Sequence, residues 1–302
     1  MHCKTKPIKS QEQDLKKVAS LIFDMNIGGQ ALIEGVLMRS PHHVAVAVRS
    51  PNGKIVTKAY RKEHPAITYK HLPIIRGFLA LIDMLAIGMK ELFWSSEISS
   101  GEKMSRQESG WSLALSIAFA LALFVALPFY VSKLVTEQYW LFNLLEGMLR
   151  VIIFLGYILV IAQFKDIQRV FQYHGAEHAS IACHESSKKL TPENVKKFST
   201  IHPRCGTAFI FIVLILSIIV FSFAYHPSWL MRFFGRIMLI PVIAGLSYEL
   251  LKLNAKYHLP VLSWFSIPGL WLQKITTRRP DKSQIEVTIA ALKLALARER
   301  TK

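Results

Sequence analysis

The chain has 302 residues, of which 52% are hydrophobic and only 19% are charged. A soluble domain of this length needs a charged exterior, so the composition argues against an ordinary soluble protein. The formal net charge of +17 would by itself favour nucleic-acid binding. The Lys and Arg residues instead flank apolar runs, and no stretch combines stacking aromatic residues with arginines. We therefore expect a lipid bilayer as the partner and no nucleic acid.

The cysteine content and the N-terminal segment bear on disulfides and on membrane insertion. The three cysteines are Cys3, Cys183 and Cys205, an odd number without a secretory framework, so structural disulfides are not expected. Met1–Leu21 is polar, rich in Lys and without the apolar region of a cleavable signal peptide. We expect a basic, disordered leader over residues 1–25 and insertion through internal segments.

Two segments before the first apolar run are predicted to lie outside the bilayer. Residues 26–70 are expected to form a small β-rich cytosolic unit. Within it, His43–Arg49 is typical of a strand, and Pro51–Gly53 of a turn that leads into a return strand at Lys54–Thr57. Residues 71–110 show apolar residues at helical spacing, interrupted by charges, which predicts an amphipathic interfacial helix. Its apolar face suits either a membrane surface or packing against a helix bundle.

Residues 111–275 are predicted to form a bundle of about four transmembrane helices with a cytosolic loop at 165–206. Trp111–Ser132 has no charged residue over 22 positions, and Thr207–Tyr225, with 19 uncharged residues, is the clearest span. Two weaker candidates, which contain charged residues, complete the set: Leu141–Phe164 and Trp229–Leu253.

Ionisable residues inside the weaker spans are costly in lipid and therefore indicate functional groups or contacts within the bundle. Glu146 and Arg150 are spaced i, i+4 and are expected to pair. Arg232 and Arg236 lie near one end of the last span, and Glu249 lies near the other.

The distribution of Lys and Arg predicts the orientation. The first 110 residues hold sixteen of them and the loop 165–206 holds seven, against one in Lys133–Trp140. Four passes with both termini in the cytosol satisfy the positive-inside rule. His258–Ile275, with two prolines and a glycine, is expected to be re-entrant or interfacial. The cytosolic tail 276–302 is expected to contain an amphipathic helix over Ser283–Arg300.

The motif H-x-x-E-H, made by His174, Glu177 and His178, is the strongest chemical signal in the chain. On a helix, positions i and i+4 place both imidazoles on one face, where they can share a divalent metal ion, of which Zn²⁺ is the first choice. Glu177 would act as general base, as in inverted zincins. The alternative is a pair of interfacial histidines that face headgroups or the bundle, beside a solvated Glu177.

Further metal ligands are expected at the same membrane depth. Glu249 is one candidate, although a carboxylate near the end of a span can also reach water or pair with Lys252. His202 and Cys205 have ligand-compatible spacing and softness. The alternative for this second cluster is a membrane-entry turn with a buried thiol and an interfacial Arg204.

A glycine-punctuated segment near the N-terminus is a third place to look. Glu34 follows Gly29 and precedes Gly35, and such glycines allow the backbone to approach a ligand closely. The alternative is a tight β-turn. The chain contains no P-loop, no G-x-G-x-x-G and no G-x-S-x-G motif.

These motifs together resemble the YqhQ-like bacterial membrane proteins, which are described as predicted metal-dependent enzymes. The resemblance covers nearly the whole chain after Asn26. It rests on the segments Gly28–Ala31, Glu34–Val36 with Met38 and Arg39, Arg76–Gly77, Tyr173–His178, Asn194, His202–Thr207, Ser247–Glu249 and Thr276–Arg278. The chain departs from the family at Arg279, where an acidic residue is usual. The resemblance implies a multi-pass membrane protein with a metal site and says little about the substrate.

The sequence thus predicts a mainly α-helical polytopic protein of the bacterial inner membrane. Its expected function is that of a metal-dependent hydrolase acting at the cytosolic face on a membrane or peptide substrate. The ligands would be His174, His178, Glu249, His202 and Cys205. Two alternatives stay open: a non-catalytic scaffold or assembly factor, and a transporter whose path is lined by ionisable residues of the spans. The oligomeric state is left open.

Overall fold

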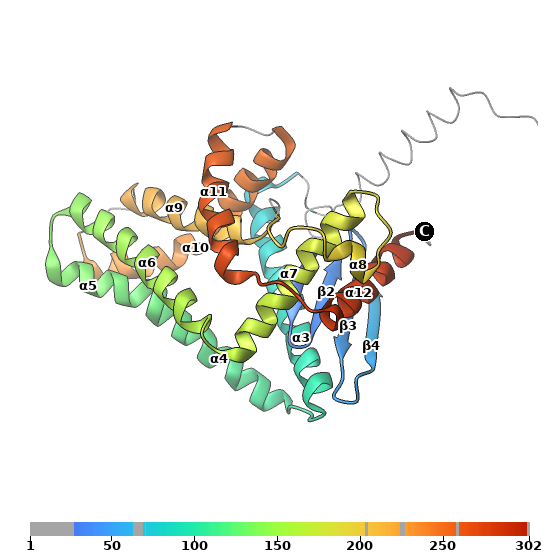
Figure 1. Ribbon diagram of the computed structural model, residues 1–302. Helices are drawn as coiled ribbons and strands as arrows, with labels where there is room; N and C mark the ends of the chain where they lie inside the picture. Colours follow the sequence, from blue (N-terminus) through green and yellow to red (C-terminus); the bar gives the residue numbers. More distant parts are fainter. Residues whose placement is uncertain are drawn as a thin grey trace, which may run out of the picture.

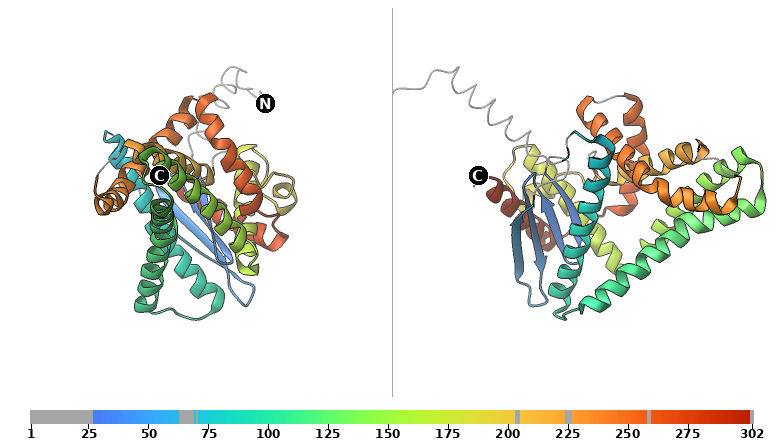
Figure 2. Two further views of the ribbon diagram at one scale, coloured as in Figure 1. Left: turned by 90° about the vertical axis from the view of Figure 1, so that its left-hand side faces the viewer. Right: turned by 180° about the vertical axis from the view of Figure 1, so that it is seen from behind.

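The computed structural model describes residues 27–62, 69, 71–202, 205–223, 227–257 and 260–300, so the predicted leader lies outside it. The described chain forms a layered unit around an antiparallel sheet and an arm of long helices beside it (Figure 1). A view from behind shows the helices of the arm running out from the layered unit and back (Figure 2).

The sheet has four strands that pair antiparallel in chain order. They are β1 Gly28–Leu32, β2 Gly35–Arg39, β3 His43–Arg49 and β4 Ile55–Arg61. The predicted β3–β4 hairpin is confirmed, and Gly53 in its turn has φ of 80°, which glycine adopts without strain. In β3, Val44 and Val46 face one side and Ala45 the other, so both faces of the sheet are apolar and both need a cover.

Three helices provide that cover. α3, Pro73–Ser100, packs on the face of the β3 valines through Ile87. α7, Lys165–Glu185, and α12, Lys282–Arg300, pack on the opposite face. The helix predicted for the C-terminal tail is therefore confirmed. It shares one core with the N-terminal strands, so the β-rich segment is not a separate unit (Figure 1).

The arm consists of helices whose apolar side chains point outward. They are α4 Arg106–Leu121, the π-helical turn η1 Ala122–Ala126, α5 Leu127–Val135, α6 Tyr139–Ile161, α9 Thr207–Phe223, α10 Trp229–Tyr257 and α11 Pro260–Thr276. Leu115, Ile152 and Met238 are among the many large apolar residues exposed on them. Such surfaces are stable when lipid covers them, so the helix composition indicates that the protein associates with a membrane.

Three stretches among the described residues are long and apolar enough to cross a membrane, rather than the predicted four. They are Arg106–Val135, Tyr139–Ile161 and Trp229–Leu253. The span predicted as the clearest, Thr207–Tyr225, is helical as α9 over Thr207–Phe223, the last described residue before position 227.

The remaining segments connect the arm with the layered unit. α3 packs along α10, which is one of the two roles considered for residues 71–110, while α11 packs on α9. The approach of α3 to α10 is close, because Gly77 lies against the backbone of Gly245. The short helix α8, Pro192–Val195, packs on α7, and Thr191 caps it by accepting from the Asn194 N–H.

Candidate metal centre

α7 carries the H-x-x-E-H motif and lies between the arm and the sheet (Figure 1). His174 and His178 are one helical turn apart, and their ring centroids are separated by 4.3 Å. Both imidazoles therefore lie on one side of the helix, as their i, i+4 spacing predicts.

The protonation of both rings follows from their hydrogen bonds. His174 Nδ1 lies 2.9 Å from the carbonyl oxygen of Thr276, and His178 Nδ1 lies 2.6 Å from that of Thr200. A carbonyl oxygen can only accept a hydrogen bond, so in both rings the proton of the neutral imidazole sits on Nδ1. Each Nε2 then keeps its lone pair, as in metal-binding histidines that donate their other nitrogen to a backbone carbonyl.

Cys205 completes a group of three potential ligands. Its Sγ lies 3.3 Å from His174 Nε2, and one ligand atom each of His174, His178 and Cys205 falls within 4.8 Å of the other two. Two ligands of one tetrahedral zinc ion lie about 3.3 to 3.8 Å apart, so only small movements separate this arrangement from a coordination sphere. In the described part of the chain no other group of three His, Cys, Asp or Glu side chains comes together in this way.

Glu177 is buried against the first strand. Its side chain packs so closely on Gly29 that a Cβ there would lie 2.7 Å from Glu177 Cγ. Burial raises the pKa of Glu177 to about 7, while the nearby His174 and a hydrogen bond from the Gly29 backbone act to lower it. A carboxyl group therefore lies on the helix turn that carries both histidines.

His202 lies beside the three ligands and points elsewhere. Its ring centroid is 5.8 Å from that of His178, but its Nε2 lies 3.4 Å from a carboxylate oxygen of Glu185. The Gln273 side chain accepts from the backbone N–H of His202 at 2.9 Å and donates to its carbonyl oxygen at 3.0 Å. Gln273 thus positions the segment that leads to Cys205. No sequence motif marks this amide, and its only signal is that it is a polar residue in a mostly apolar stretch.

The other predicted site residues lie apart from the three ligands. Glu249 forms an ion pair with Arg76 through both oxygens, at 2.7 and 2.5 Å. Glu34 has φ of 51° in the turn between β1 and β2 and binds Arg169 on α7. Both carboxylates connect elements that are distant in sequence, which is a structural role.

One of the two predicted arginines also lies outside the cluster. Arg39 donates to Asp83 of α3 at 2.6 Å and so connects β2 with that helix. Arg204 lies outside the described residues.

The fold and the cluster together define a membrane-associated helical protein with a His–His–Cys group at the base of its arm. A sequence model of the family described as "Protein of unknown function (DUF1385)" matches residues 72–298, and the chain belongs to this family. It is 38% identical over 285 residues to the "Uncharacterized protein YqhQ" of Bacillus subtilis (strain 168), a match that covers 87% of this chain and 89% of that protein. No solved structure matches.

Proposed function

We propose that His174, His178 and Cys205 bind a divalent metal ion and that this centre serves a hydrolytic reaction at the membrane surface. The observation that carries the proposal is the convergence of three ligand atoms within 4.8 Å while both Nδ1 atoms are bound to backbone carbonyls. Histidines that only pack in a core have no need to place two unprotonated Nε2 atoms near one thiol.

The donor set favours zinc. Two imidazole nitrogens and one sulfur combine borderline and soft ligands, which suits Zn²⁺ better than Mg²⁺ or Ca²⁺. Three protein ligands leave a fourth position for a substrate, as in catalytic rather than structural zinc sites. When bound, such an ion polarises a water molecule or a carbonyl oxygen.

Glu177 is the residue to which we assign proton transfer. It lies on the same turn of α7 as both histidines, and the Gly29 backbone holds its carboxyl group in place. Gln273 positions the Cys205 segment, and the carbonyl groups of Thr200 and Thr276 orient the two rings. These groups come from α7, α11 and the loop before α9, so the site depends on the arm being docked against the layered unit.

Metal analysis of the purified chain tests the centre. We expect the unaltered chain to contain a stoichiometric amount of a divalent metal. The metal content of His178→Ala and of Cys205→Ser should be lower by a factor of about ten or more. His184→Ala is the matched control, because His184 lies on the same helix outside the cluster. Equal metal content in all four proteins would remove the proposal.

The same preparations separate metal binding from hydrolysis. Glu177→Gln should keep the metal, because Glu177 is not one of the three ligands. A substrate should then accumulate in membranes that contain Glu177→Gln when their lipids and peptides are compared with those of the unaltered chain. If the metal is present and the two membranes have the same composition, the centre is structural.

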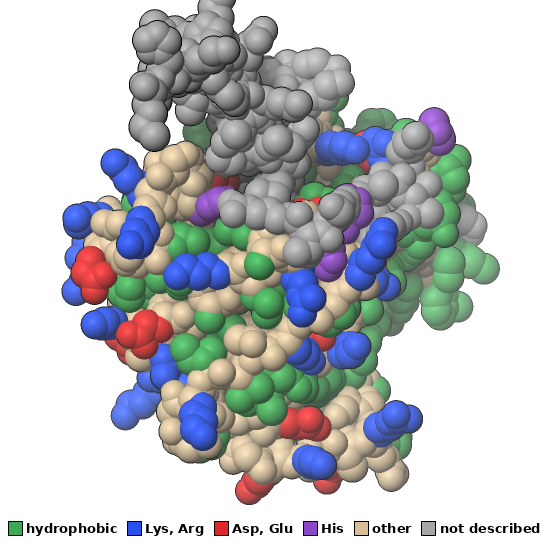
Figure 3. All heavy atoms as spheres, turned by 90° about the vertical axis from the view of Figure 1, so that its right-hand side faces the viewer, with side chains coloured by type: hydrophobic (Ala, Val, Ile, Leu, Met, Phe, Trp, Pro, Cys, Tyr) green, Lys and Arg blue, Asp and Glu red, His purple; other side chains and the backbone are tan. Residues whose placement is uncertain are grey.

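We also propose that the chain lies in the bacterial inner membrane with both termini in the cytosol. The loops on the side of the layered unit carry most of the Lys and Arg, as cytoplasmic loops do. Figure 3 shows Lys and Arg side chains spread over the end of that unit, with fewer acidic ones among them. In this orientation the metal centre faces the cytosol at the membrane surface.

A further inference from the structure

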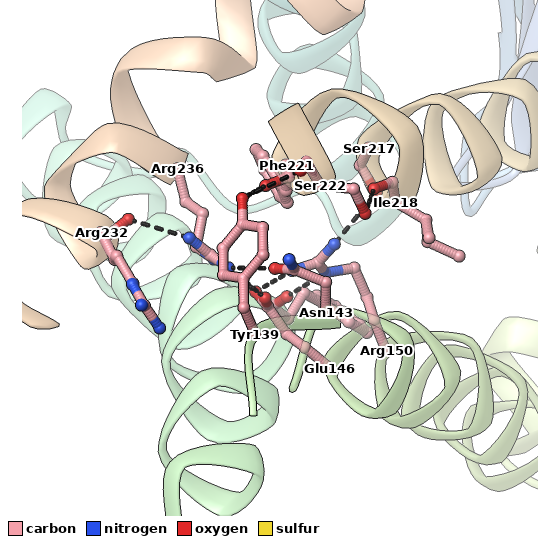
Figure 4. A network of polar contacts seen from close by, with 11 residues as sticks. Tyr139, Asn143, Glu146, Arg150, Ser217, Ile218, Phe221, Ser222, Arg232 and Arg236 are labelled. Atoms are coloured by element: carbon pink, nitrogen blue, oxygen red, sulfur yellow. Dashed lines mark hydrogen bonds and ion pairs between the residues drawn. The ribbon is translucent and has the colours of Figure 1, made fainter. Parts of the chain in front are cut away.

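A second polar cluster lies inside the arm, away from the metal centre, and is centred on Glu146 of α6 (Figure 4). Arg150 donates to one of its oxygens at 2.7 Å, which confirms the predicted i, i+4 pair. Arg236 of α10 approaches from the opposite side and donates to both oxygens, at 2.7 to 2.9 Å. Glu146 and Arg236 are each only 1% exposed, so two helices far apart in sequence share one desolvated ion network.

The network holds more positive than negative charge. Two guanidinium groups share the single carboxylate of Glu146, and a third, that of Arg232, lies one turn before Arg236. The Arg232 side chain is also buried and stacks 4.5 Å above the Trp229 ring. A charge without a counter-charge is costly inside an apolar bundle, so the two guanidinium groups of Arg150 and Arg236 on the one carboxylate of Glu146 favour the entry of an anion.

The sequence around Pro128 holds Arg150 in this position. A proline has no N–H, so Pro128 cannot donate to the carbonyl oxygen four residues earlier in the helix, that of Phe124. This oxygen, in the π-helical turn η1, accepts from Arg150 Nε at 2.9 Å. Arg150 Nη1 donates to Ser217 Oγ of α9 at 3.0 Å. With these contacts each of the three nitrogens of the Arg150 guanidinium donates a hydrogen bond within the bundle.

Asn143 gives a second and independent indication of a ligand. Its Oδ1 accepts from Arg236 Nη2 at 3.0 Å, and this contact settles which end of the amide is oxygen, because two donors cannot face each other. Its Nδ2 is buried and has no hydrogen-bond partner, although the residue is only 2% exposed. A buried donor without an acceptor is destabilising, and a bound acceptor would remove that cost.

The network lies near one end of the bundle. Glu146 and Arg236 each come seven positions after the first residue of their helix, about 10 Å along the axis. At that end Tyr139 donates to the Phe221 and Ser222 carbonyl oxygens, and Arg232 stacks on Trp229 and Tyr139. Tyr and Trp mark the headgroup level of bilayers, so Arg232 and Arg236 form a two-step series of guanidinium groups from that level inward.

We propose that Asn143, Arg232 and Arg236 bind a phosphate group at the end of the arm remote from the metal centre. Phosphate offers several strong acceptors to the Asn143 amide and the planar guanidinium groups, and its charge balances the excess of arginine. The group belongs either to a phospholipid headgroup or to inorganic phosphate, since both present the same chemistry. The site is independent of the proposed hydrolytic function.

The substitution Asn143→Asp tests the site without removing any side chain. Aspartate keeps the oxygen that Arg236 needs, cancels one positive charge and replaces the free donor by an acceptor. We expect the apo protein to be at least as stable as the unaltered chain, and phosphate binding to weaken about tenfold or more. Gln138→Glu is the matched control, because it makes the same amide-to-carboxylate change at an exposed position just before α6. Arg232→Gln serves as a second variant that leaves the pairs of Glu146 in place.

The measurement is the melting temperature of the full chain in a phosphate-free detergent, with added phosphatidylglycerol or with added inorganic phosphate. The site is supported if the added ligand raises the melting temperature of the unaltered chain and of Gln138→Glu, but not that of Asn143→Asp or Arg232→Gln. If only the phospholipid gives the rise, the ligand is a headgroup, and if inorganic phosphate also does, it is free phosphate. The proposal is overturned if neither addition stabilises the unaltered chain or if all four proteins respond equally.

Discussion

Glu299 of α12 shows how a single carboxylate can connect the two ends of the chain. Its oxygens accept from Ser40 Oγ and His42 Nδ1, in the turn between β2 and β3, at 2.7 Å and from His43 Nδ1, at the start of β3, at 3.0 Å. Burial acts to raise the pKa of Glu299, but the hydrogen bonds from His43, Ser40 and His42 outweigh it and hold the pKa at about 2. This carboxylate is therefore bound more strongly in its charged form.

The low pKa of Glu299 predicts an acid-dependent loss of stability. A folded-state pKa below the ordinary 4.5 stabilises the fold above pH 4.5, and this contribution, up to about 3 kcal/mol, is lost as the pH falls toward 2. Glu299→Gln should lower the melting temperature near neutral pH, and the difference from the unaltered chain should shrink in melts at about pH 3. Glu286→Gln on the same helix is the control, since its ion pair with Arg49 is exposed and contributes little. A difference that does not vary with pH would contradict the assignment.

At the scale of elements, the approach of β1 to α7 depends on one glycine. A Cβ at Gly29 would lie 2.7 Å from Glu177 Cγ and 2.8 Å from the Leu37 carbonyl oxygen, whereas one at Gly28 would meet nothing within 4 Å. Gly29→Ala should therefore destabilise the fold by about 1 to 3 kcal/mol, and Gly28→Ala by less than about 0.5 kcal/mol. Both changes lie in the same strand, so the difference between their melting temperatures isolates the close contact. Equal melting temperatures would show that α7 can move away.

The elements with local signals were predictable from the sequence. The β3–β4 hairpin, the helix α12 and the pair of Glu146 with Arg150 all follow from periodicity or spacing over a few residues. The packing of α12 on the sheet could not be predicted, because an amphipathic pattern predicts a helix but not the element on which it packs.

In the candidate site, too, the contacts with local signals were predictable and the long-range contacts were not. The motif spacing placed His174 and His178 on one face, and the cluster before α9 supplied Cys205. Glu249 was selected because it lies at a similar membrane depth, but two residues at one depth can be far apart in the plane of the membrane. Its ion pair with Arg76 has no local signature. The ion pair of Arg236 with Glu146 across two helices could not be predicted for the same reason.

At the scale of the whole molecule, the His–His–Cys group lies where the arm joins the layered unit, and the proposed phosphate site lies near the far end of the arm (Figures 1 and 4). With the membrane around the arm, the two sites would open on opposite sides of it. The proposed orientation then places the metal centre in the cytosol and the phosphate site in the outer leaflet.

Thiol labelling checks this orientation. Glu137 lies in the loop between α5 and α6 and Lys188 in the loop after α7, and both are exposed. In intact spheroplasts a membrane-impermeant maleimide should label Glu137→Cys, and it should label Lys188→Cys only after the membrane is disrupted. The unaltered chain gives the background from its own cysteines. The reverse pattern would invert the topology, and labelling of both positions in intact spheroplasts would contradict a membrane-spanning arm.

The cover of the N-terminal strands by α12 has a consequence for biosynthesis. More than two hundred residues separate the end of β4 at Arg61 from the start of α12 at Lys282. At about 5 to 20 residues per second, a ribosome needs roughly 10 to 40 s to produce the helix that protects this face of the sheet. Nascent chains must therefore produce the whole arm while one face of the sheet is still open to chaperones and proteases.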